Sequence, residues 1–343
     1  MISPWNFPLL LGLIDAIPAL AAGCAVVIKP SEVTPRFIAP LRATLTGVPD
    51  LRDVVGIVEG AGDVGAGLID LVDSVCFTGS VATGRHVGAA AAAAFIPAFL
   101  ELGGKDPAIV LAGADLKRAS SAVLWGSVAN AGQSCLSIER IYVQEDIHDE
   151  FVGLLAGKAR QVRLARPGPD DGQLGPLIDP AQAEIISRQL ADAYEHGARA
   201  LTGGEVQRHD GGLWIEPTVL TGVDHSMTVM RDETFGPVMP VMPVSGADEA
   251  VMLANDSEFG LSAAVFAADA DTARAVAGRI RAGAVSINDA ALTALVHEGE
   301  KNSFNYSGLG GSRMGPASIR RFVRKQTLIV NHAAARDPWW HTP

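Results

Sequence analysis

Two residues of this 343-residue chain stand in settings that suit covalent chemistry. Cys135 ends the stretch Asn-Ala-Gly-Gln-Ser-Cys, in which small and polar residues follow an expected helix. Such a turn leaves the thiol accessible as a nucleophile and its backbone N–H free to bind a developing oxyanion. Free cysteines are more often packed in a core, and the apolar neighbours of Cys24 and Cys76 fit that alternative. The neighbours of Cys135 do not fit it.

Glu101 follows an apolar segment, residues 95–100, that we expect to be a strand, and it precedes two glycines. Burying a carboxylate at that point is costly unless the group has a partner or a role. One such role is that of a general base. A salt-bridged or surface glutamate is the alternative, and the local sequence leaves both open.

A small-residue turn and two charged residues could bind a nucleotide. Gly79 and Ser80 follow an expected strand, and Gly84 lies inside the helix that comes next. Glycines at a strand-to-helix turn let a phosphate approach the helix N-terminus. The spacing is not Gly-x-Gly-x-x-Gly, so the turn alone is a weak signal. Lys29 and Glu32, after another expected strand, could hold ribose hydroxyls or be ordinary turn residues.

The elements that would position these residues alternate between strand and helix. In the first hundred residues we expect strands at 25–28, 54–58, 74–77 and 95–100, and helices at 9–22, 35–45, 63–70 and 80–90. A second unit follows from residue 105, with strands near 107–111, 141–143, 214–215, 238–241 and 263–266 and helices near 116–130, 148–161, 180–195 and 272–280. A helix at 317–325 and a strand at 327–331 end the chain. Short apolar strands between helices indicate an α/β fold with a parallel sheet covered on both faces, in a layout that resembles a dinucleotide-binding sheet.

Composition argues against several classes of protein. Hydrophobic residues make up 48% of the chain and charged residues 19%, which excludes a largely disordered chain. The net charge of −11 argues against a general nucleic-acid-binding surface, since such a surface needs clustered positive charge. Three widely spaced cysteines form neither a disulfide framework nor a metal motif, so we expect no metal site and a reducing, cytoplasmic location.

Residues 7–28 are almost wholly apolar, which is long enough for a membrane span. Asp15 lies in the middle of this run, two prolines and two glycines interrupt it, and no cationic segment precedes it as in a secretory signal. We therefore expect a buried helix followed by a short buried strand, and no association with a membrane.

Six ordered motifs together resemble the aldehyde dehydrogenase superfamily. They are Pro-Trp-Asn-Phe-Pro at 4–8, Lys-Pro-Ser-Glu at 29–32, Phe-Thr-Gly-Ser at 77–80 with a glycine at 84, Glu-Leu-Gly-Gly-Lys at 101–105, Gly-Gln-x-Cys at 132–135 and Glu-x-Phe-Gly-Pro-Val at 233–238. The intervals between them also resemble those of the family. The resemblance extends from Pro4 to about Asn331.

The resemblance implies a role for each matched residue. Cys135 would attack an aldehyde, with the oxyanion held by the Asn6 amide and the Cys135 N–H, and Glu101 would activate the water that hydrolyses the resulting thioester. A carboxylate at Glu32 would repel a 2′-phosphate, which favours NAD over NADP. The cofactor-binding set would be Trp5, Lys29, Glu32, Gly79, Ser80, Gly84, Glu233 and Phe235.

The implied architecture has three parts. They are a Rossmann-type NAD-binding domain at residues 1–104 that lacks the family's N-terminal segment, an α/β catalytic domain at 105–300, and a C-terminal return at 301–343 with an oligomerisation strand. A homo-oligomer is expected where the N-terminal segment is present. Residues 297–306 depart from the family pattern before Ser-Gly-x-Gly at 307–310, in a loop that borders the substrate entrance in the family.

The expected function is NAD-dependent oxidation of a small aldehyde to a carboxylic acid. Two alternatives stay open. One is a coenzyme A-acylating relative, against which Glu101 argues, and the other is an inactive truncated chain or an assembly partner.

Overall fold

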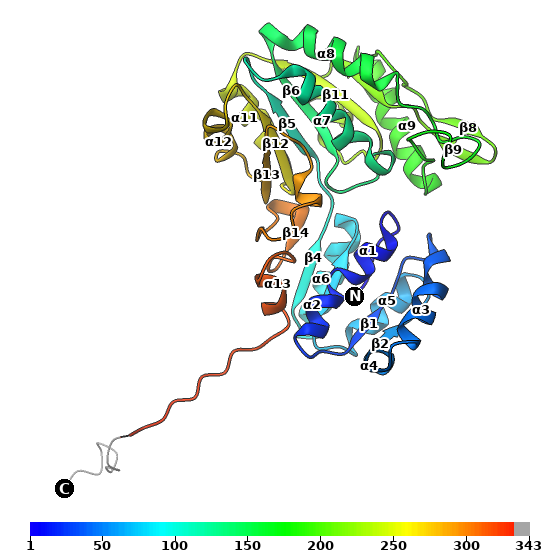
Figure 1. The fold of residues 1–343 in the computed structure, drawn as a ribbon, viewed down its shortest axis with the longest axis vertical. Helices are drawn as coiled ribbons and strands as arrows, with labels where there is room; N and C mark the ends of the chain where they lie inside the picture. Colours follow the sequence, from blue (N-terminus) through cyan, green and yellow to red (C-terminus); the bar gives the residue numbers. More distant parts are fainter. Residues whose placement is uncertain (333–343) are drawn as a thin grey trace.

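The structure, a computed structural model that describes residues 1–332, has two α/β lobes, between which the chain crosses twice (Figure 1). It first crosses at residues 102–105, between β4 and β5. It returns between β13 and β14 (Figure 1). Both crossings pass close to the residues that the motifs single out.

The first lobe is built on a two-stranded sheet, β1-β2, and a three-stranded sheet, β14-β4-β3, whose strands are mostly parallel. Its strands are β1 (Val26–Ile28), β2 (Val55–Ile57), β3 (Val75–Thr78), β4 (Ala98–Glu101) and β14 (Gly308–Leu309). β1 pairs with β2 and β3 with β4, both in parallel, and β14 pairs antiparallel with β4. Ile2 forms parallel bridges to Lys29 and to Phe77, so the backbone around Ile2 lies between the β1 and β3 edges. The expected parallel arrangement is confirmed.

The helices of the first lobe are α1 (Pro8–Leu13), α2 (Ala16–Ala21), η1 (Pro35–Phe37), α3 (Ile38–Thr46), α4 (Pro49–Arg52), α5 (Gly62–Ile69) and α6 (Val81–Ala93). The prediction of one buried helix over residues 9–22 is wrong, because the chain breaks at Asp15, whose carboxylate pairs with distant arginines instead of capping α2. The strand expected from residue 95 begins only at Ala98. Phe95 is almost fully exposed and has a φ of +59°, which no strand accommodates.

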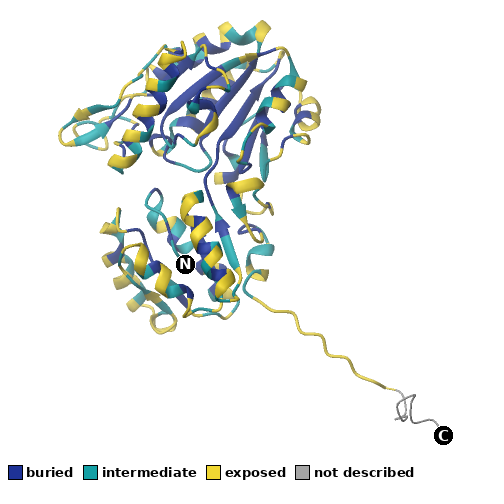
Figure 2. Ribbon diagram, turned by 180° about the vertical axis from the view of Figure 1, so that it is seen from behind, coloured by how far each residue is buried: buried dark blue, intermediate teal, exposed yellow. Residues whose placement is uncertain are grey.

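The second lobe contains a seven-stranded sheet in the order β13-β12-β5-β6-β11-β10-β7. Its strands are β5 (Asp106–Val110), β6 (Ile138–Gln144), β7 (Arg199–Ala200), β10 (Thr218–Thr221), β11 (Val238–Val244), β12 (Ser262–Phe266) and β13 (Ala284–Ile287). Only β7 runs antiparallel to its neighbour. Along β5, Ile109 joins one apolar core, whereas Ala108 and Val110 join the other. Both faces of the sheet are therefore buried, as Figure 2 shows.

Helices cover the two faces of this sheet. The core on one face contains residues of α7 (Leu116–Val128) and α8 (Glu145–Ala159), and the core on the other contains residues of α9 (Pro180–Glu195), α10 (Thr228–Arg231), α11 (Ala247–Asn255) and α12 (Ala270–Ala277). A small hairpin, β8 (Gln207–His209) and β9 (Gly212–Trp214), lies outside the sheet. The predicted helix at 180–195 is confirmed. The helices α7, α8 and α12 begin or end a few residues away from their predicted bounds.

Short elements connect the lobes at the C-terminal side: η3 (Leu292–Ala294), η4 (Asn305–Ser307) and α13 (Ala317–Arg320). The helix expected at 317–325 is thus shorter than predicted, and residues 327–331 form no strand. The segment extends away from both lobes (Figure 1), and a strand forms only against a neighbouring strand. Residues 333–343 of the expected C-terminal part lie outside the described residues.

In residues 1–332, no helix is both long enough and apolar enough to cross a membrane. The apolar run at residues 7–28 is divided among α1, α2 and β1. Leu9, Leu10 and Ile17 on its two helices are largely exposed, so the run is less buried than we expected.

Asp15 connects the C-terminal return to the first lobe. Its carboxylate accepts hydrogen bonds from Arg313, at 2.5 Å, and from Arg321. All three side chains are buried. Burial alone would raise the pKa of Asp15, but the two guanidinium groups outweigh it and hold that pKa below its usual value. Arg313 also donates to Thr78 Oγ1 at 2.7 Å, so this cluster reaches the end of β3.

The Asp15→Asn substitution tests this connection, because it leaves two buried guanidinium groups without their counter-charge. We expect a loss of about 3–5 kcal/mol in the free energy of unfolding, measured by urea denaturation at neutral pH. The difference from the unsubstituted chain shrinks as the pH falls below about 4, because Asp15 takes up a proton there in the unfolded chain and only at lower pH in the folded one. Asp53→Asn, at an exposed ion pair with Arg52, is the control and changes stability by about 0.5 kcal/mol or less. Equal effects of the two substitutions would contradict the role of Asp15.

Candidate active site

Cys135 lies in a tight loop between α7 and β6, in which η2 (Ala129–Gly132) precedes it. Asn130, Ala131 and Gly132 all have positive φ, at 53°, 56° and 69°. A Cβ on Gly132 would lie 2.2 Å from the carbonyl carbon of Gly236, so this close approach requires glycine. The Cys135 loop therefore lies directly against the loop that follows Phe235.

The side chain of Gln133 holds this loop in place. Its amide nitrogen donates to the Asn130 carbonyl at 3.0 Å, and its amide oxygen accepts from the Ile178 N–H at 2.8 Å. Gln133 is fully buried, so both bonds are shielded from water. The turn before Cys135 is thereby fixed from two sides.

Asn6 bonds the first lobe to the Cys135 loop. Its Nδ2 donates to the Gln133 carbonyl at 3.0 Å, and Asn130 Nδ2 donates to the Asn6 carbonyl at 2.9 Å. An amide nitrogen has two N–H groups, so one stays available for a second acceptor. Asn6 and Cys135 line the same cavity, as the expected oxyanion site requires.

That cavity has a volume of about 140 Å³ and is lined from both lobes by Pro4, Trp5, Asn6, Leu11, Thr78, Gly79, Ser80, Glu101, Leu102, Gly103, Cys135, Gln182, Glu233 and Phe235. It brings together all three expected catalytic residues and five of the eight expected cofactor-binding residues. Gly84 is not among them. A Cβ on Gly84 would lie 2.5 Å from a methyl group of Leu102, so this glycine lets α6 pack closely against the chain beside Glu101.

Glu101 is the last residue of β4, and does not follow the strand as we expected. In the sheet it lies between Thr78 and Gly308, and its carbonyl accepts from the Gly79 N–H at 3.1 Å. Ser303 Oγ donates to the carboxylate at 3.5 Å. The backbone of Glu101 is thus fixed on both sides, while its side chain reaches the Cys135 cavity.

The carboxylate of Glu233 lies against the crossing between the lobes. Its Oε1 accepts from the Gly104 N–H at 3.0 Å, and a Cβ on Gly103 would lie 2.5 Å from Oε2. Burial raises the pKa of Glu233 to about 8. Gly103 and Gly104 therefore leave room for the carboxylate of Glu233 close to the chain that follows Glu101.

Trp5 and Phe235 form an aromatic pair across the two lobes. Their ring centroids are 5.4 Å apart and the rings meet edge to face, at 82°. Phe235 has a φ of +51°, which turns its ring toward the cavity side of its loop. The pair forms one wall of the cavity.

A buried ion pair that the motif analysis missed holds the Glu233–Phe235 segment. Lys105 Nζ lies 2.8 Å from Glu139 Oε2 and donates to Thr234 Oγ1 at the same distance. The Glu139 carboxylate also accepts from the backbone N–H groups of Thr234 and Phe235, at 2.7 and 2.8 Å. Burial lowers the pKa of Lys105, and the charge of Glu139 opposes that shift. A glutamate inside an apolar strand such as β6 is the sequence signal that could have revealed this pair.

A second cavity, of about 410 Å³, adjoins the first and shares Pro4, Trp5, Thr78, Gly79 and Ser80 with it. Lys29 and Glu32 line it and form an ion pair of 3.0 Å. Ser80 caps α6, with its Oγ accepting from the Thr83 N–H at 3.3 Å.

These groups fit an extended dinucleotide. Glu32 and Glu233 place a carboxyl group at each end of the joined cavities, where ribose hydroxyls could be bound. The N-terminus of the 13-residue helix α6 lies between them, where a pyrophosphate could be bound.

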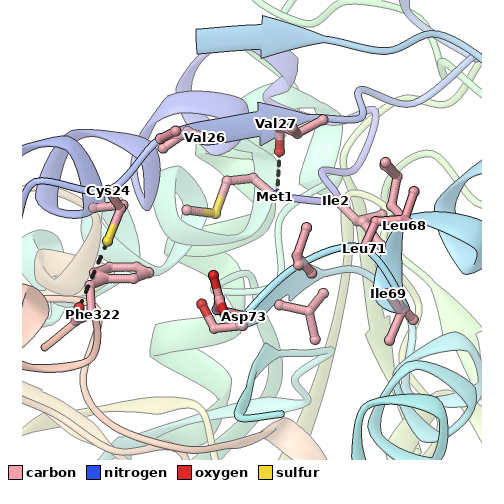
Figure 3. Close-up of a pocket in the computed structure, with 15 residues that line it drawn as sticks. Met1, Ile2, Cys24, Val26, Val27, Leu68, Ile69, Leu71, Asp73 and Phe322 are labelled. Carbon is pink, nitrogen blue, oxygen red and sulfur yellow. Dashed lines mark hydrogen bonds between the residues drawn. The ribbon is translucent and has the colours of Figure 1, made fainter. Parts of the chain in front are cut away.

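A third cavity, of about 350 Å³, lies beside Met1 and between residues of β1 and β3 (Figure 3). Figure 3 shows Cys24 and Phe322 on one side of it and Leu68, Ile69 and Leu71 on the other. It shares no lining residue with the Cys135 cavity. The thiol of Cys24 is directed at the Phe322 carbonyl, 3.8 Å away. In residues 1–332, no group of three or more His, Cys, Asp or Glu side chains could hold a metal ion.

Residues 1–328 match the family model described as "Aldehyde dehydrogenase family". A provisionally named succinate-semialdehyde dehydrogenase [NADP(+)] of Mycolicibacterium smegmatis is 38% identical over an alignment that covers 98% of this chain and 66% of that protein. A betaine aldehyde dehydrogenase of Mesorhizobium japonicum is 40% identical, over 98% of this chain and 70% of that protein. The chain thus spans about two thirds of the length of the curated relatives it matches.

Solved structures are similar over nearly the whole chain. A provisionally named aldehyde dehydrogenase, PutA, from Anabaena variabilis has a TM-score of 0.97 and 61% identity, over 99% of this chain and 72% of that one. The betaine aldehyde dehydrogenase of Staphylococcus aureus in complex with NAD+ has a TM-score of 0.92 and 34% identity, over 99% of this chain and 68% of that one.

The Glu139→Gln substitution tests whether the buried ion pair holds the loop of Thr234 and Phe235 in place. The substitution removes the charge that binds the N–H groups of Thr234 and Phe235. We expect hydrogen exchange at these two amides to become about tenfold to a hundredfold faster, because hydrogen bonds to a charged acceptor are worth more than those to a neutral one. We expect hydrogen exchange in α8, which does not contact these two amides through Glu139, to stay unchanged. Glu150→Gln, on the exposed side of α8, is the matched control. Unchanged exchange at both loop amides would show that Glu139 does not hold them.

Proposed function

The chain belongs to the aldehyde dehydrogenase family, and from that premise we propose that it oxidises a small aldehyde to a carboxylic acid with NAD+ as acceptor. The observation that carries the proposal is the meeting of Cys135, Glu101 and Asn6 in one cavity, beside Glu233 and Phe235. A nucleophile, a base and an oxyanion donor are what acyl chemistry on an aldehyde requires.

Cys135 supplies the nucleophile. Burial raises the pKa of its thiol to about 12, so the thiol would pass its proton to solvent water as the sulfur bonds to the carbonyl carbon. The carbonyl oxygen then carries the charge, and the free N–H of Asn6 Nδ2 and the Cys135 N–H would bind it. Bound NAD+ supplies the acceptor for the hydride that leaves this carbon. A thioester on Cys135 remains.

Glu101 completes the reaction by activating water. Its carboxylate takes a proton from the water that attacks the thioester carbon, and the Cys135 sulfur leaves as thiolate. The proton on Glu101 would then return to the Cys135 thiolate, which leaves a carboxylic acid and the free enzyme. The presence of a carboxylate in the Cys135 cavity favours water over coenzyme A as the acyl acceptor.

NAD+ is the proposed cofactor and not NADP+, on the basis of Glu32. Its carboxylate is half-exposed at the far end of the joined cavities, where it would accept from a ribose 2′-hydroxyl and repel a 2′-phosphate. Lys29 holds it by the 3.0 Å ion pair. Ser80 at the start of α6 would lie at the pyrophosphate, and Glu233 and Phe235 at the nicotinamide ribose and ring. Trp5 packs on Phe235. Gly79 and Gly84 would let the cofactor come close to the turn and to the start of α6.

The same proposal assigns a role to each of the three parts of the chain. Residues 1–104 would bind the cofactor, residues 105–300 would supply the nucleophile, and residues 301–343 would return the chain and join subunits. Leu328, Ile329 and Val330 are exposed, which supports association into a homo-oligomer. Three free cysteines support a cytoplasmic location. Light scattering on the purified protein would measure the oligomeric state.

Cys135→Ser and Glu101→Gln separate the two half-reactions. With an aldehyde panel and NAD+, we expect Cys135→Ser to abolish formation of the reduced cofactor, measured by its absorbance. Glu101→Gln should give one turnover and then a rate lower by about 10²–10⁴-fold, because the base is missing only for hydrolysis. Mass spectrometry should then find an acyl group on the Cys135 peptide.

Cys24→Ser is the matched thiol control and keeps full activity, since Cys24 lies outside the joined cavities. Formation of acyl-coenzyme A in place of the acid would replace the proposal with an acylating reaction. If Cys135→Ser is as active as the unsubstituted chain, the proposal that Cys135 carries the reaction is wrong.

The pH dependence of NAD+ binding tests Glu233. Its carboxyl group, with a pKa of about 8, is protonated at pH 6.5 and ionised at pH 9. The ionised form accepts stronger hydrogen bonds from ribose hydroxyls, so calorimetry should show affinity rising about fivefold to tenfold across this interval. Glu233→Gln should remove this dependence. A pH dependence of equal size in both proteins would assign it to another group.

A further inference from the structure

Arg313 lies between Asp15 and the wall of the Cys135 cavity. Only 8% of it is exposed, and its Nη2 donates both to Asp15 Oδ2, at 2.5 Å, and to Thr78 Oγ1, at 2.7 Å. Its Nε is buried and has no hydrogen-bond partner within residues 1–332. The two bonds at Nη2 thus orient the guanidinium group, and they do so although an unpaired buried donor is costly. Asp15 fixes one side of the group, and Thr78 accepts from it toward the cavity.

Thr78 and Glu101 are the last residues of two neighbouring strands. They are register partners in the parallel pair of β3 and β4. Paired strands lie about 4.8 Å apart, with partner side chains on the same face of the sheet. Both residues line the cavity of Cys135. The hydroxyl that accepts from Arg313 is therefore a direct neighbour of the base proposed for hydrolysis.

The Thr78 hydroxyl still has its own hydrogen to donate, because it accepts from Arg313 with a lone pair. That hydrogen points away from the guanidinium group, since on the other side it would face the N–H groups of a cation. A hydroxyl that accepts from a cation is also a stronger donor, because hydrogen bonds in a chain polarise one another. The contact with Arg313 therefore gives Thr78 a strengthened donor for a group on the cavity side.

The Glu101 carboxylate is held loosely enough to accept this hydrogen. Ser303 Oγ approaches it at 3.5 Å, beyond the roughly 2.5–3.0 Å of a normal O–H···O hydrogen bond. A carboxylate offers about four lone-pair sites on its two oxygens, so one oxygen can accept from Thr78 while the other receives a proton from water. A rotation of the Glu101 side chain inside the cavity would bring the two groups together.

We propose that Arg313 is a positioning residue for hydrolysis, which orients the Thr78 hydroxyl so that it holds the Glu101 carboxylate while water attacks the thioester. The proposal rests on the aldehyde oxidation proposed above. Thr78 fixes one carboxylate oxygen, and the other oxygen takes the proton from water. Asp15 thereby supports hydrolysis as well as the connection between the C-terminal return and the first lobe.

The first measurement separates hydrolysis from oxidation. The ester p-nitrophenyl acetate acylates the Cys135 thiol and releases p-nitrophenol, which gives an acetyl thioester without any cofactor. Mass spectrometry of the Cys135 peptide then follows the loss of the acetyl group. We expect Thr78→Val and Arg313→Met each to slow this loss by about tenfold or more, because hydrogen bonds to charged groups are worth at least that factor. Thr78→Ser retains the hydroxyl and should retain most of the rate.

The double variant Thr78→Val/Arg313→Met separates positioning from a general loss of structure. Because both residues act through one hydrogen bond to Glu101, we expect the double variant to lose the acetyl group no more slowly than the slower single variant. Independent structural effects would multiply, which would overturn the proposal. Thr78→Val replaces a hydroxyl by a methyl group of similar size, so it tests the same bond even if Arg313→Met fails to fold. An unchanged rate in Thr78→Val would also overturn the proposal.

Arg321→Met is the matched control. It removes the second arginine that binds Asp15 but leaves the bond between Arg313 and Thr78 in place. We expect this variant to lose the acetyl group at the rate of the unsubstituted chain. A slowing as large as that of Arg313→Met would assign the effect to the buried charge cluster and overturn the role of the Thr78 bond.

The second measurement follows the reduced cofactor through the first turnover with an aldehyde and NAD+. Thr78→Val should form the first equivalent as fast as the unsubstituted chain and then slow down, because hydrolysis alone is impaired. A first turnover slowed as much as the later ones would overturn the proposal, since the hydroxyl would then act on the cofactor or on the attack by Cys135. Absence of oxidation with every aldehyde, together with hydrolysis that depends on Thr78 and Arg313, would count against the proposed reaction only.

Discussion

The buried ion pair of Lys105 and Glu139 is the interaction on which the site's geometry depends. Lys105 ends the crossing between the lobes, and Glu139 lies in a central strand of the seven-stranded sheet. The carboxylate of Glu139 binds two consecutive N–H groups, at Thr234 and Phe235, in a loop that has no regular structure of its own. Because neither charge is exposed, neither can lose its partner without a large cost. The pair therefore fixes the Phe235 loop to the sheet and to the crossing at once.

The same loop carries the contacts that bring the lobes together. Glu233 lies against the glycines of the crossing, and Phe235 packs on Trp5 of the first lobe. Within the second lobe, Gly236 lies against Gly132 and so holds this loop beside Cys135. On the opposite side, Asp15 bonds the C-terminal return to the first lobe through two arginines. The cavity of Cys135 is thus enclosed by interactions that join segments far apart in the sequence.

The motifs predicted which residues meet. The motifs at 29–32, 77–80 and 101–105 stand at the carboxyl ends of the parallel strands β1, β3 and β4, whereas those with Cys135 and Glu233 precede β6 and β11. The alternation of short apolar strands with helices likewise predicted the parallel sheets. The break at Asp15 and the hydrogen bonds of Glu139 could not be predicted in the same way, since their partners lie far along the chain. Residues 327–331 have the composition of a strand, but a strand also needs a neighbour, which composition does not report. The sequence predicted that Gly84 belongs to a nucleotide-binding turn. Its contact with Leu102 could not be predicted, because that contact depends on how α6 packs in the folded chain.

The crossing at residues 102–105 has one further consequence. Glu101 stands at its start, the glycines beside Glu233 form its middle, and Lys105 ends it. A rotation of one lobe against the other would be transmitted along these four residues, and it would change the gap between Glu101 and Cys135 before it disturbed either core. The angle between the lobes therefore sets the distance between Glu101 and Cys135. A ligand that spans both lobes would narrow the spread of that angle, and hence the spread of the Glu101–Cys135 distance among individual molecules.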